Sequence, residues 1–157
     1  MIAVNSIINK KLIKLNVNGN SKKEIIVELA KLIDEQGRLN SIDEYIEEVL
    51  KREELSTTGI GFGVAIPHGK TNAVKVPTVA FGRIKDGVEW QSLDGEPVHI
   101  VFLLAVPEKA ASNAHLKILA ALSRKLMDEN FREELLTVNS EEKLIETLET
   151  IFANALD

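Results

Sequence analysis

The sequence of 157 residues contains no cysteine. Disulfide bonds, thiol catalysis and cysteine-based metal sites are therefore excluded. Only three histidines are present, His68, His99 and His115, and they lack the paired spacing of a zinc-binding helix. No apolar segment approaches the roughly 20 residues of a membrane span, and the N-terminus lacks the layout of a secretion signal. We therefore expect a cytoplasmic protein with no metal and no other cofactor.

Positive charge is also scarce. The chain has 19 Lys and Arg against 24 Asp and Glu, a formal net charge of −5, and its pI is about 5.3. Proteins that bind nucleic acids usually carry a basic patch, and no dense run of Lys and Arg occurs here, so we expect no nucleic-acid partner. The length suffices for one domain with a sizeable core, which we place at residues 1–157.

The most informative stretch is residues 56–70, Ser-Thr-Thr-Gly-Ile-Gly-Phe-Gly-Val-Ala-Ile-Pro-His-Gly-Lys. Residues 64–66 indicate a short buried strand, and Pro67 should end it because proline cannot donate to a sheet ladder. His68 would then stand at a strand end, and Gly69 would leave room for a group to approach its ring. This mounting suits a reactive imidazole, although an ordinary turn histidine is the commoner arrangement.

Two nucleotide-binding patterns fail in this stretch. Residues 69–71, Gly-Lys-Thr, look like the end of a P-loop, but that motif needs a glycine where Val64 stands. The dinucleotide pattern that would start at Gly61 meets Ile66 where its third glycine should be. The sequence therefore argues against nucleotide binding through this loop.

Helix and strand patterns follow one another along the chain. Capping boxes at residues 21–24 and 41–44 predict two helices, and Gly37 should stop the first. Later helices should begin near Ser112 or Asn113, at Asp128 and at residues 139–142. The expected strands are residues 12–17, 78–84, 88–91 and 98–106, the middle two joined by a type I′ hairpin at residues 85–87.

The strand expected at residues 98–106 is almost uninterruptedly apolar, as in a central strand covered on both faces. Helices before, between and after the strands indicate an α/β protein. We predict one domain in which a mixed β-sheet is flanked by helices on both faces.

His115 falls in the first turn of its expected helix, where free backbone N–H groups and the helix dipole favour an anion. A neutral His115 could donate a ring N–H to a phosphate oxygen. Alone it would be interpreted as a surface histidine, but with His68 it forms a candidate pair of donor and nucleophile. The apolar stripe of the same helix should include Leu116 and Leu119. His99 lies within an expected strand and is interpreted as a satisfied structural residue.

Several motifs along the chain belong together. They are Arg52-Glu53, Ser56-Thr57, residues 58–61 (Thr-Gly-Ile-Gly), residues 65–70 (Ala-Ile-Pro-His-Gly-Lys), residues 93–97 (Leu-Asp-Gly-Glu-Pro), residues 114–116 (Ala-His-Leu) and residues 122–124 (Leu-Ser-Arg). With these motifs the sequence resembles, over nearly the whole chain, the EIIA domain of the fructose/mannitol class of the bacterial sugar phosphotransferase system. The resemblance implies that His68 carries the phosphate, that His115 lies beside it, and that Arg52 serves the same site.

A phosphoryl group on His68 adds nearly two negative charges. Those charges need N–H donors and a cation, and the candidates are the Gly69 N–H, Lys70, His115 and Arg52. Phosphoryl transfer depends mostly on positioning and electrostatics, so a small site without metal suffices.

Partner proteins should dock around His68. Ile60 and Phe62 are apolar residues of the glycine-rich loop, and a core position is favoured for Ile60. Phe62, between two glycines, is harder to bury and is assigned to the docking surface. Glu53 and Glu54 are the nearest carboxylates in sequence and should form its rim.

The resemblance implies a phosphotransferase that takes phosphate from phospho-HPr and passes it to a cysteine of a IIB domain during sugar uptake. The carrier would be associated with the membrane permease only indirectly, and residues 78–82 and 90–95 look closer to the fructose branch than to the mannitol branch. One alternative is a nitrogen-related regulatory phosphotransferase protein, whose phosphorylation state is read by binding partners. Another is a detached regulatory domain of a transcription activator, against which the lack of a basic helix counts.

Overall fold

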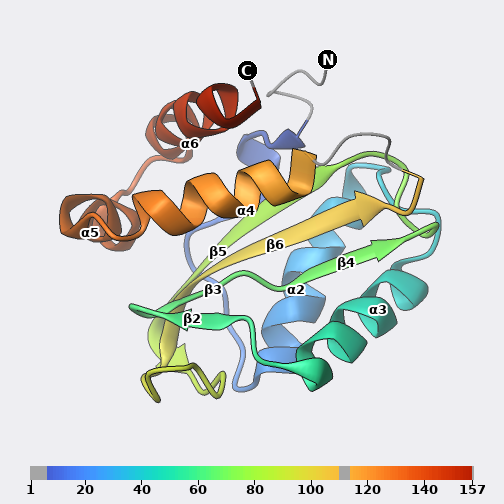
Figure 1. The fold of residues 1–157 in the computed structure, drawn as a ribbon, viewed down its shortest axis with the longest axis horizontal. Helices are drawn as coiled ribbons and strands as arrows, with labels where there is room; N and C mark the ends of the chain where they lie inside the picture. The colour runs from blue at the N-terminus through green and yellow to red at the C-terminus, as the bar shows by residue number, and fades with distance from the viewer. Residues whose placement is uncertain (1–6, 110–113, 157) are drawn as a thin grey trace.

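The computed structural model describes residues 7–109 and 114–156. Its helices and strands are η1 (Lys10–Leu12), β1 (Ile13–Lys14), α2 (Lys22–Glu35), α3 (Ile42–Leu55), β2 (Gly59–Gly61), β3 (Val64–Ala65), β4 (His68–Thr71), β5 (Thr78–Val88), β6 (Val98–Pro107), α4 (Ala114–Lys125), α5 (Glu129–Thr137) and α6 (Glu141–Leu156). The strands form a six-stranded mixed sheet in the order β1-β5-β6-β3-β2, with β4 also paired to β6. Helices α2 and α3 cover one face of the sheet, and α4 crosses the other (Figure 1). The predicted α/β class, with a mixed sheet between helices, is confirmed.

The helices begin where the sequence predicts. Ser21 and Ser41 accept hydrogen bonds from the backbone N–H groups of Glu24 and Glu44, as capping boxes require. Asp128 caps α5 in a similar way. The expected cap at Ser112 or Asn113 lies outside the described residues. No helix within the described ranges is both long enough and apolar enough to span a bilayer.

Strand β6 is the centre of the sheet, as its apolar sequence predicts. It pairs antiparallel with β5 on one side and parallel with β3 and β4 on the other. Phe102 of β6 packs edge-to-face on Phe81 of β5, with ring centroids 5.3 Å apart. His99 is half-buried, and its Nδ1 lies 3.0 Å from the carbonyl oxygen of Ile84, so it is satisfied by the backbone as expected.

The hairpin predicted at residues 85–87 is wrong, because β5 runs unbroken from Thr78 to Val88. The pairing passes from Arg83 opposite Ile100 to Val88 opposite Val98, so the residues between form an irregularity in the ladder. Gly87 does have a positive φ of 77°, but it serves that irregularity and not a turn. The expected return strand at residues 88–91 does not form beyond Val88.

The strand predicted at residues 12–17 is also too long. Only Ile13 and Lys14 pair with β5, and the residues before them form η1, whose cap Asn9 accepts a hydrogen bond from the N–H of Lys11. The apolar alternation instead places Leu15 and Val17 in the core beside the sheet. Alternate side chains are therefore buried in this segment although its backbone does not pair continuously with β5.

Candidate functional site

His68 lies in the sheet and not in a turn. Strand β3 stops before Pro67 as predicted, but the chain then continues as β4, a strand that the sequence did not reveal. Both β3 and β4 pair with β6, with Ala65 opposite Val101 and His68 opposite Leu104. Pro67 marks the break between them, and its carbonyl accepts a hydrogen bond from Leu104 at 3.0 Å. The histidine is thus fixed by the central strand.

The ring of His68 is oriented by its own backbone. Its Nδ1 lies 3.1 Å from the carbonyl oxygen of Ile66. Because a carbonyl only accepts, Nδ1 carries the proton and Nε2 keeps its lone pair. Burial lowers the pKa of His68, the Ile66 carbonyl raises it, Arg52 lowers it and Glu53 raises it, with a net lowering from 6.5. His68 is therefore neutral near pH 7, with Nε2 available as a nucleophile.

Gly69 permits close packing between β4 and α3. A Cβ at Gly69 would lie 2.9 Å from Cγ2 of Val49 and 3.2 Å from Cε1 of Tyr45, both on α3. The Tyr45 hydroxyl also donates to the Leu104 carbonyl at 2.7 Å. The missing side chain therefore leaves room for α3 and not for a group at the His68 ring, and α3 is held against the strand that carries the histidine.

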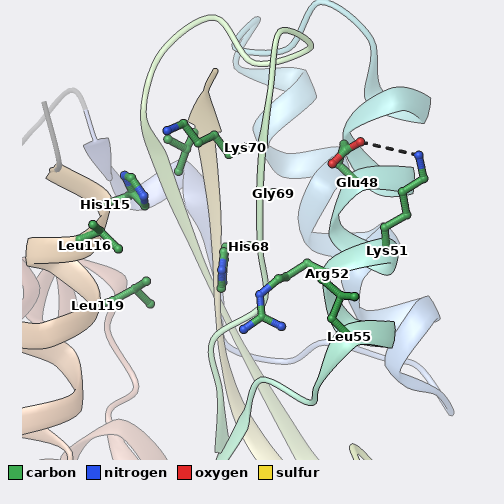
Figure 2. Close-up of a pocket in the computed structure, with 11 residues that line it drawn as sticks. Glu48, Lys51, Arg52, Leu55, His68, Gly69, Lys70, His115, Leu116 and Leu119 are labelled. Atoms are coloured by element: carbon green, nitrogen blue, oxygen red, sulfur yellow. Dashed lines mark ion pairs between the residues drawn. The ribbon is translucent and has the colours of Figure 1, made fainter. Parts of the chain in front are cut away.

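Arg52 extends from the last turn of α3 toward His68 (Figure 2). Its Nη1 donates to the Ser56 carbonyl at 2.9 Å, which caps the helix end. A pocket of about 350 Å³ opens between α3, β4 and α4, and it is lined by Glu48, Lys51, Arg52, Leu55, His68, Gly69, Lys70, Val106, His115, Leu116 and Leu119. The structure thus brings the five predicted phosphate-site residues to one pocket.

His115 enters this pocket from the first turn of α4, where the sequence placed it. Burial lowers its pKa from 6.5, and the nearby Lys70 and His68 lower it further. Its Nδ1 is buried and has no hydrogen-bond partner within the described part of the chain. A neutral His115 beside a helix N-terminus fits a site that receives negative charge.

The prediction that Glu53 belongs to an exposed rim is wrong. Its side chain is 4% exposed, and its carboxylate is engaged by Lys22, Thr58 and Trp90. Burial follows because Lys22 and Trp90 come from segments distant in sequence, which local spacing could not reveal. The adjacent Glu54 is exposed, as a rim residue must be.

Ile60 and Phe62 differ as expected. Ile60 is partly buried and packs against the core, whereas Phe62 is 58% exposed. Phe62 has a positive φ of 59°, rare for a bulky residue, and its N–H donates to Asp94 at 3.1 Å. The guanidinium of Arg132 lies over its ring, 4.4 Å from the centroid. The ring is therefore held at the surface.

The apolar stripe predicted for α4 is only partly correct. Leu122 is buried and Leu119 is partly buried against the core, as expected, but Leu116 is 53% exposed, and Ile118 is buried although it was not expected in the stripe. Leu55, at the end of α3, is 83% exposed. Leu55, Leu116 and Leu119 line the pocket from both helices, and Figure 2 shows them on opposite sides of His68.

Residues 6–151 match the family described as phosphoenolpyruvate-dependent sugar phosphotransferase system, EIIA 2. The chain is 45% identical over 145 residues to the PTS system fructose-specific EIIABC component of Bacillus subtilis, which covers 92% of this chain and 23% of that protein. It is 39% identical over 145 residues to the fructose-specific EIIA component of Haloferax volcanii, covering 92% and 94%. It is 41% identical over 116 residues to a nitrogen regulatory protein of Bradyrhizobium diazoefficiens, covering 74% of each.

Solved structures give the same result. Nitrogen regulatory protein IIA-Ntr from Neisseria meningitidis has a TM-score of 0.85 at 37% identity, covering 92% of this chain and 98% of that one. The complex of enzyme IIA for mannitol with phosphorylated IIB from Escherichia coli has a TM-score of 0.78 at 23% identity, over 91% and 97% of the chains, which shows a shared fold alone. The family match, the relatives and the fold agree, and the chain belongs to the EIIA 2 family of the phosphoenolpyruvate-dependent sugar phosphotransferase system.

Proposed function

We propose that this chain is a cytoplasmic phosphocarrier that accepts a phosphoryl group from phospho-HPr on Nε2 of His68 and passes it to a cysteine of a IIB domain. Family membership supports the phosphotransfer. The observation that carries the assignment is the bond from Nδ1 of His68 to the Ile66 carbonyl, which leaves Nε2 unprotonated beside the pocket. A neutral imidazole nitrogen is a competent nucleophile.

The proposed transfer needs no proton to leave His68. In the first step, the Nε2 lone pair forms a bond to phosphorus while the bond from phosphorus to the donor breaks, and its electron pair returns to the donor. In the second step, a thiolate of the acceptor forms an S–P bond, and the electron pair of the N–P bond returns to Nε2. The proton can stay on Nδ1, hydrogen-bonded to the Ile66 carbonyl, throughout.

Charge stabilisation would come from the groups around the pocket. The phosphoryl group carries nearly two negative charges, and Arg52, Lys70, His115 and the Gly69 N–H are the proposed donors. Arg52 and Lys70 are the cations of this set, while His115 would act as a neutral donor because its pKa is lowered. Fixed donors in a partly buried site stabilise developing charge more strongly than the same groups in water.

Partners would dock on the surface around the pocket. We assign Phe62 and Ile60 to one side of this surface and Glu54 to its rim, with Leu55 and Leu116 as apolar contacts next to His68. The acidic balance of the chain would complement a basic partner and speed its approach. Glu53 has no place in this surface because it is buried.

The sugar branch is proposed as the fructose type. The relative from Haloferax volcanii, matched over 94% of its length, is a fructose-specific EIIA component. Regulation of the nitrogen-related type is the second candidate, favoured by the IIA-Ntr structure at 37% identity and TM-score 0.85. Both functions would use His68 in the same way.

A phosphorelay assay separates these functions. The protein is incubated with phospho-HPr and then offered IIB domains and fructose. Phosphate that reaches the sugar supports the carrier function, whereas a phosphorylated protein that passes nothing on supports the regulatory one. A protein that takes up no acid-labile phosphate on His68 from any histidine-phosphorylated carrier of the system contradicts both.

A further inference from the structure

The carboxylate of Glu53 is a buried junction between three segments. Its Oε2 accepts from the Thr58 N–H at 3.2 Å and from Nζ of Lys22 on α2 at 3.4 Å. Its Oε1 accepts from the Thr58 hydroxyl and from Nε1 of Trp90 at 3.4 Å. Buried charges persist only when paired and hydrogen-bonded, and this one receives four donors. Such a set does not arise from chance surface contacts.

From Thr58 a chain of hydrogen bonds leads to the reactive ring. The carbonyl of Thr58 accepts from the N–H of Ile66 at 3.0 Å. The carbonyl of Ile66 then accepts from Nδ1 of His68 at 3.1 Å. Glu53 therefore fixes Thr58, Thr58 fixes Ile66, and Ile66 sets the tautomer and orientation of His68.

The same carboxylate secures the end of α3. Glu53 follows Arg52 directly, and Arg52 donates to Ser56 in the segment that leads to Thr58. The Thr57 hydroxyl donates to the carbonyl of Trp90 at 3.0 Å, so this segment is also tied to the residue whose indole contacts Glu53. Displacing Glu53 would thus disturb the cation and the nucleophile together.

We propose that Glu53 is a positioning residue for phosphoryl transfer, which acts through Thr58 and Ile66 to hold the His68 ring with Nε2 free toward the pocket. The inference rests on the proposed function of His68. Glu53 itself lies outside the pocket lining and touches neither the phosphate nor a partner. Its role is to hold the His68 ring and Arg52 in position relative to one another before a partner binds.

A role in positioning differs from a role in stability alone. The negative charge of Glu53 raises the pKa of His68, while burial and Arg52 lower it. Glu53→Gln removes this charge, and in either orientation its NH2 group meets a donor, the Trp90 N–H on one side or the Thr58 N–H and Lys22 on the other. The variant should therefore alter both the tautomer and the pKa of His68, which a general loss of stability would not do.

Four variants test the proposal. Glu53→Gln removes the charge, and Glu146→Gln is its control because it makes the same change on an exposed glutamate of α6, outside the proposed docking surface. Thr58→Val removes only the hydroxyl that Thr58 donates to Glu53 and leaves its backbone carbonyl, which accepts from Ile66. Lys22→Met removes the ion pair but leaves the contacts of Thr58 and Trp90, so it measures attachment to α2 alone.

The first readout needs no phosphate. Long-range ¹H–¹⁵N spectra of labelled protein report which ring nitrogen of His68 carries the proton. A pH titration reports the pKa of His68, with Arg52 and His115 unchanged in every variant. We expect the Nδ1–H form alone in the wild type, a mixture of tautomers and a lower pKa in Glu53→Gln, a mixture in Thr58→Val, and wild-type spectra in the other two. Unchanged His68 signals in a folded Glu53→Gln overturn the proposal, as does a Lys22→Met spectrum that reproduces its effect.

The second readout is transfer from phospho-HPr. A misplaced nucleophile costs about tenfold to a hundredfold in rate, and we expect a loss of this size in Glu53→Gln and Thr58→Val but not in Glu146→Gln. Should Glu53→Gln fail to fold, Thr58→Val decides, and normal spectra with normal transfer in that variant overturn the inference. A wild type that is never phosphorylated contradicts the proposed function, while the tautomer spectra still judge Glu53 separately.

Discussion

Nδ1 of His68 lies 3.1 Å from the carbonyl oxygen of Ile66, two residues before it in the chain. The residue between them is Pro67, whose ring fixes φ, so the separation of ring and carbonyl is set by a stiff link. The histidine is thereby held in one tautomer before any partner is bound. The proposed phosphorylation would then require approach of the donor but no rearrangement of His68.

Replacing His68 by Ala should abolish phosphorylation from phospho-HPr without unfolding the protein, since the ring is only partly buried and β4 is held by backbone pairing. The measurement is acid-labile phosphate on the purified variant. His99→Asn serves as the control because His99 is engaged with Ile84 and lies outside the pocket lining. An undiminished signal in His68→Ala would place the phosphate elsewhere.

His115→Ala should still take up phosphate but transfer it onward more slowly. The variant lacks a donor at the point where charge develops, and loss of one such donor costs about 3 kcal/mol, or on the order of a hundredfold in rate. Single-turnover transfer from the phosphorylated variant to a IIB domain measures the effect. Equal rates for the variant and the wild type would make His115 a bystander.

The pH dependence should follow the lowered pKa of His68. Burial, the largest cause, and Arg52 lower that pKa below 6.5 against the opposing effects of Ile66 and Glu53. Phosphorylation should therefore stay constant as the pH falls through 6.5 and decline only at lower pH, where protonation removes the lone pair of Nε2. Initial rates across this range, with the donor's own titration measured separately, check the expectation. A midpoint at or above 6.5 would contradict it.

The lowered pKa values of His68 and His115 also make the free energy of unfolding depend on pH. The unfolded chain takes up a proton at each site histidine near pH 6.5, whereas the folded chain does so only at lower pH. The stabilisation is therefore present above 6.5 and is lost as the pH falls through the folded pKa values. Urea unfolding of wild type and His68→Ala at several pH values should show a weaker dependence in the variant. A steeper dependence in the variant would reverse the assigned sign.

Gly69→Ala should destabilise the fold and slow transfer together. The new Cβ would press on Val49, and overpacking of this kind costs about 1–3 kcal/mol. It would also push α3, which carries Arg52, away from β4. Adding Val49→Ala should recover part of the unfolding free energy and of the rate. If Gly69→Ala has the same free energy of unfolding as the wild type, the close contact between α3 and β4 is not needed for stability.

Phe62→Asn tests the docking surface. Asparagine tolerates positive φ better, and relief of backbone strain, on the order of 1 kcal/mol, offsets the lost contact with Arg132, about 0.5–1 kcal/mol. We expect little change in stability but weaker binding of HPr, which should already be micromolar or weaker in the wild type. Denaturant curves and titrations followed by backbone NMR measure both quantities.

Two features of that titration test the placement of the docking surface. Association should be faster at low salt, because salt screens the acidic field of the protein. Chemical shift changes should cluster on residues 58–72 and at the start of α4. Changes confined to α6 would show that the partner binds another face.

Local signals in the sequence predicted the helices and the central strand well. The caps at Ser21, Ser41 and Asp128 depend on side chains that bond to backbone within three residues, and the burial of β6 follows from its own composition. His68 was likewise proposed from its immediate neighbours, Pro67 and Gly69, although Gly69 makes room for α3 and not for a group at the ring. Each of these features is decided within a few residues.

The errors concern features decided by distant partners. Strand β4 has no apolar alternation, and it is a strand because β6 lies beside it. Glu53 has the sequence context of an exposed helix end, and it is buried because Lys22 and Trp90 converge on it. Residues 85–87 have the composition of a hairpin, but the register with β6 makes them an irregularity within one long strand.

Because β6 is paired along both edges, its amides should exchange with deuterium only when the whole sheet opens. The backbone of His68 is paired with that strand opposite Leu104, so we expect it to belong to the part of the fold that opens most slowly. Sub-global openings at the helix ends would then leave the nucleophile in place. In exchange experiments, amide protection along β6 should be lost with the global unfolding free energy, and α6 should open well before it.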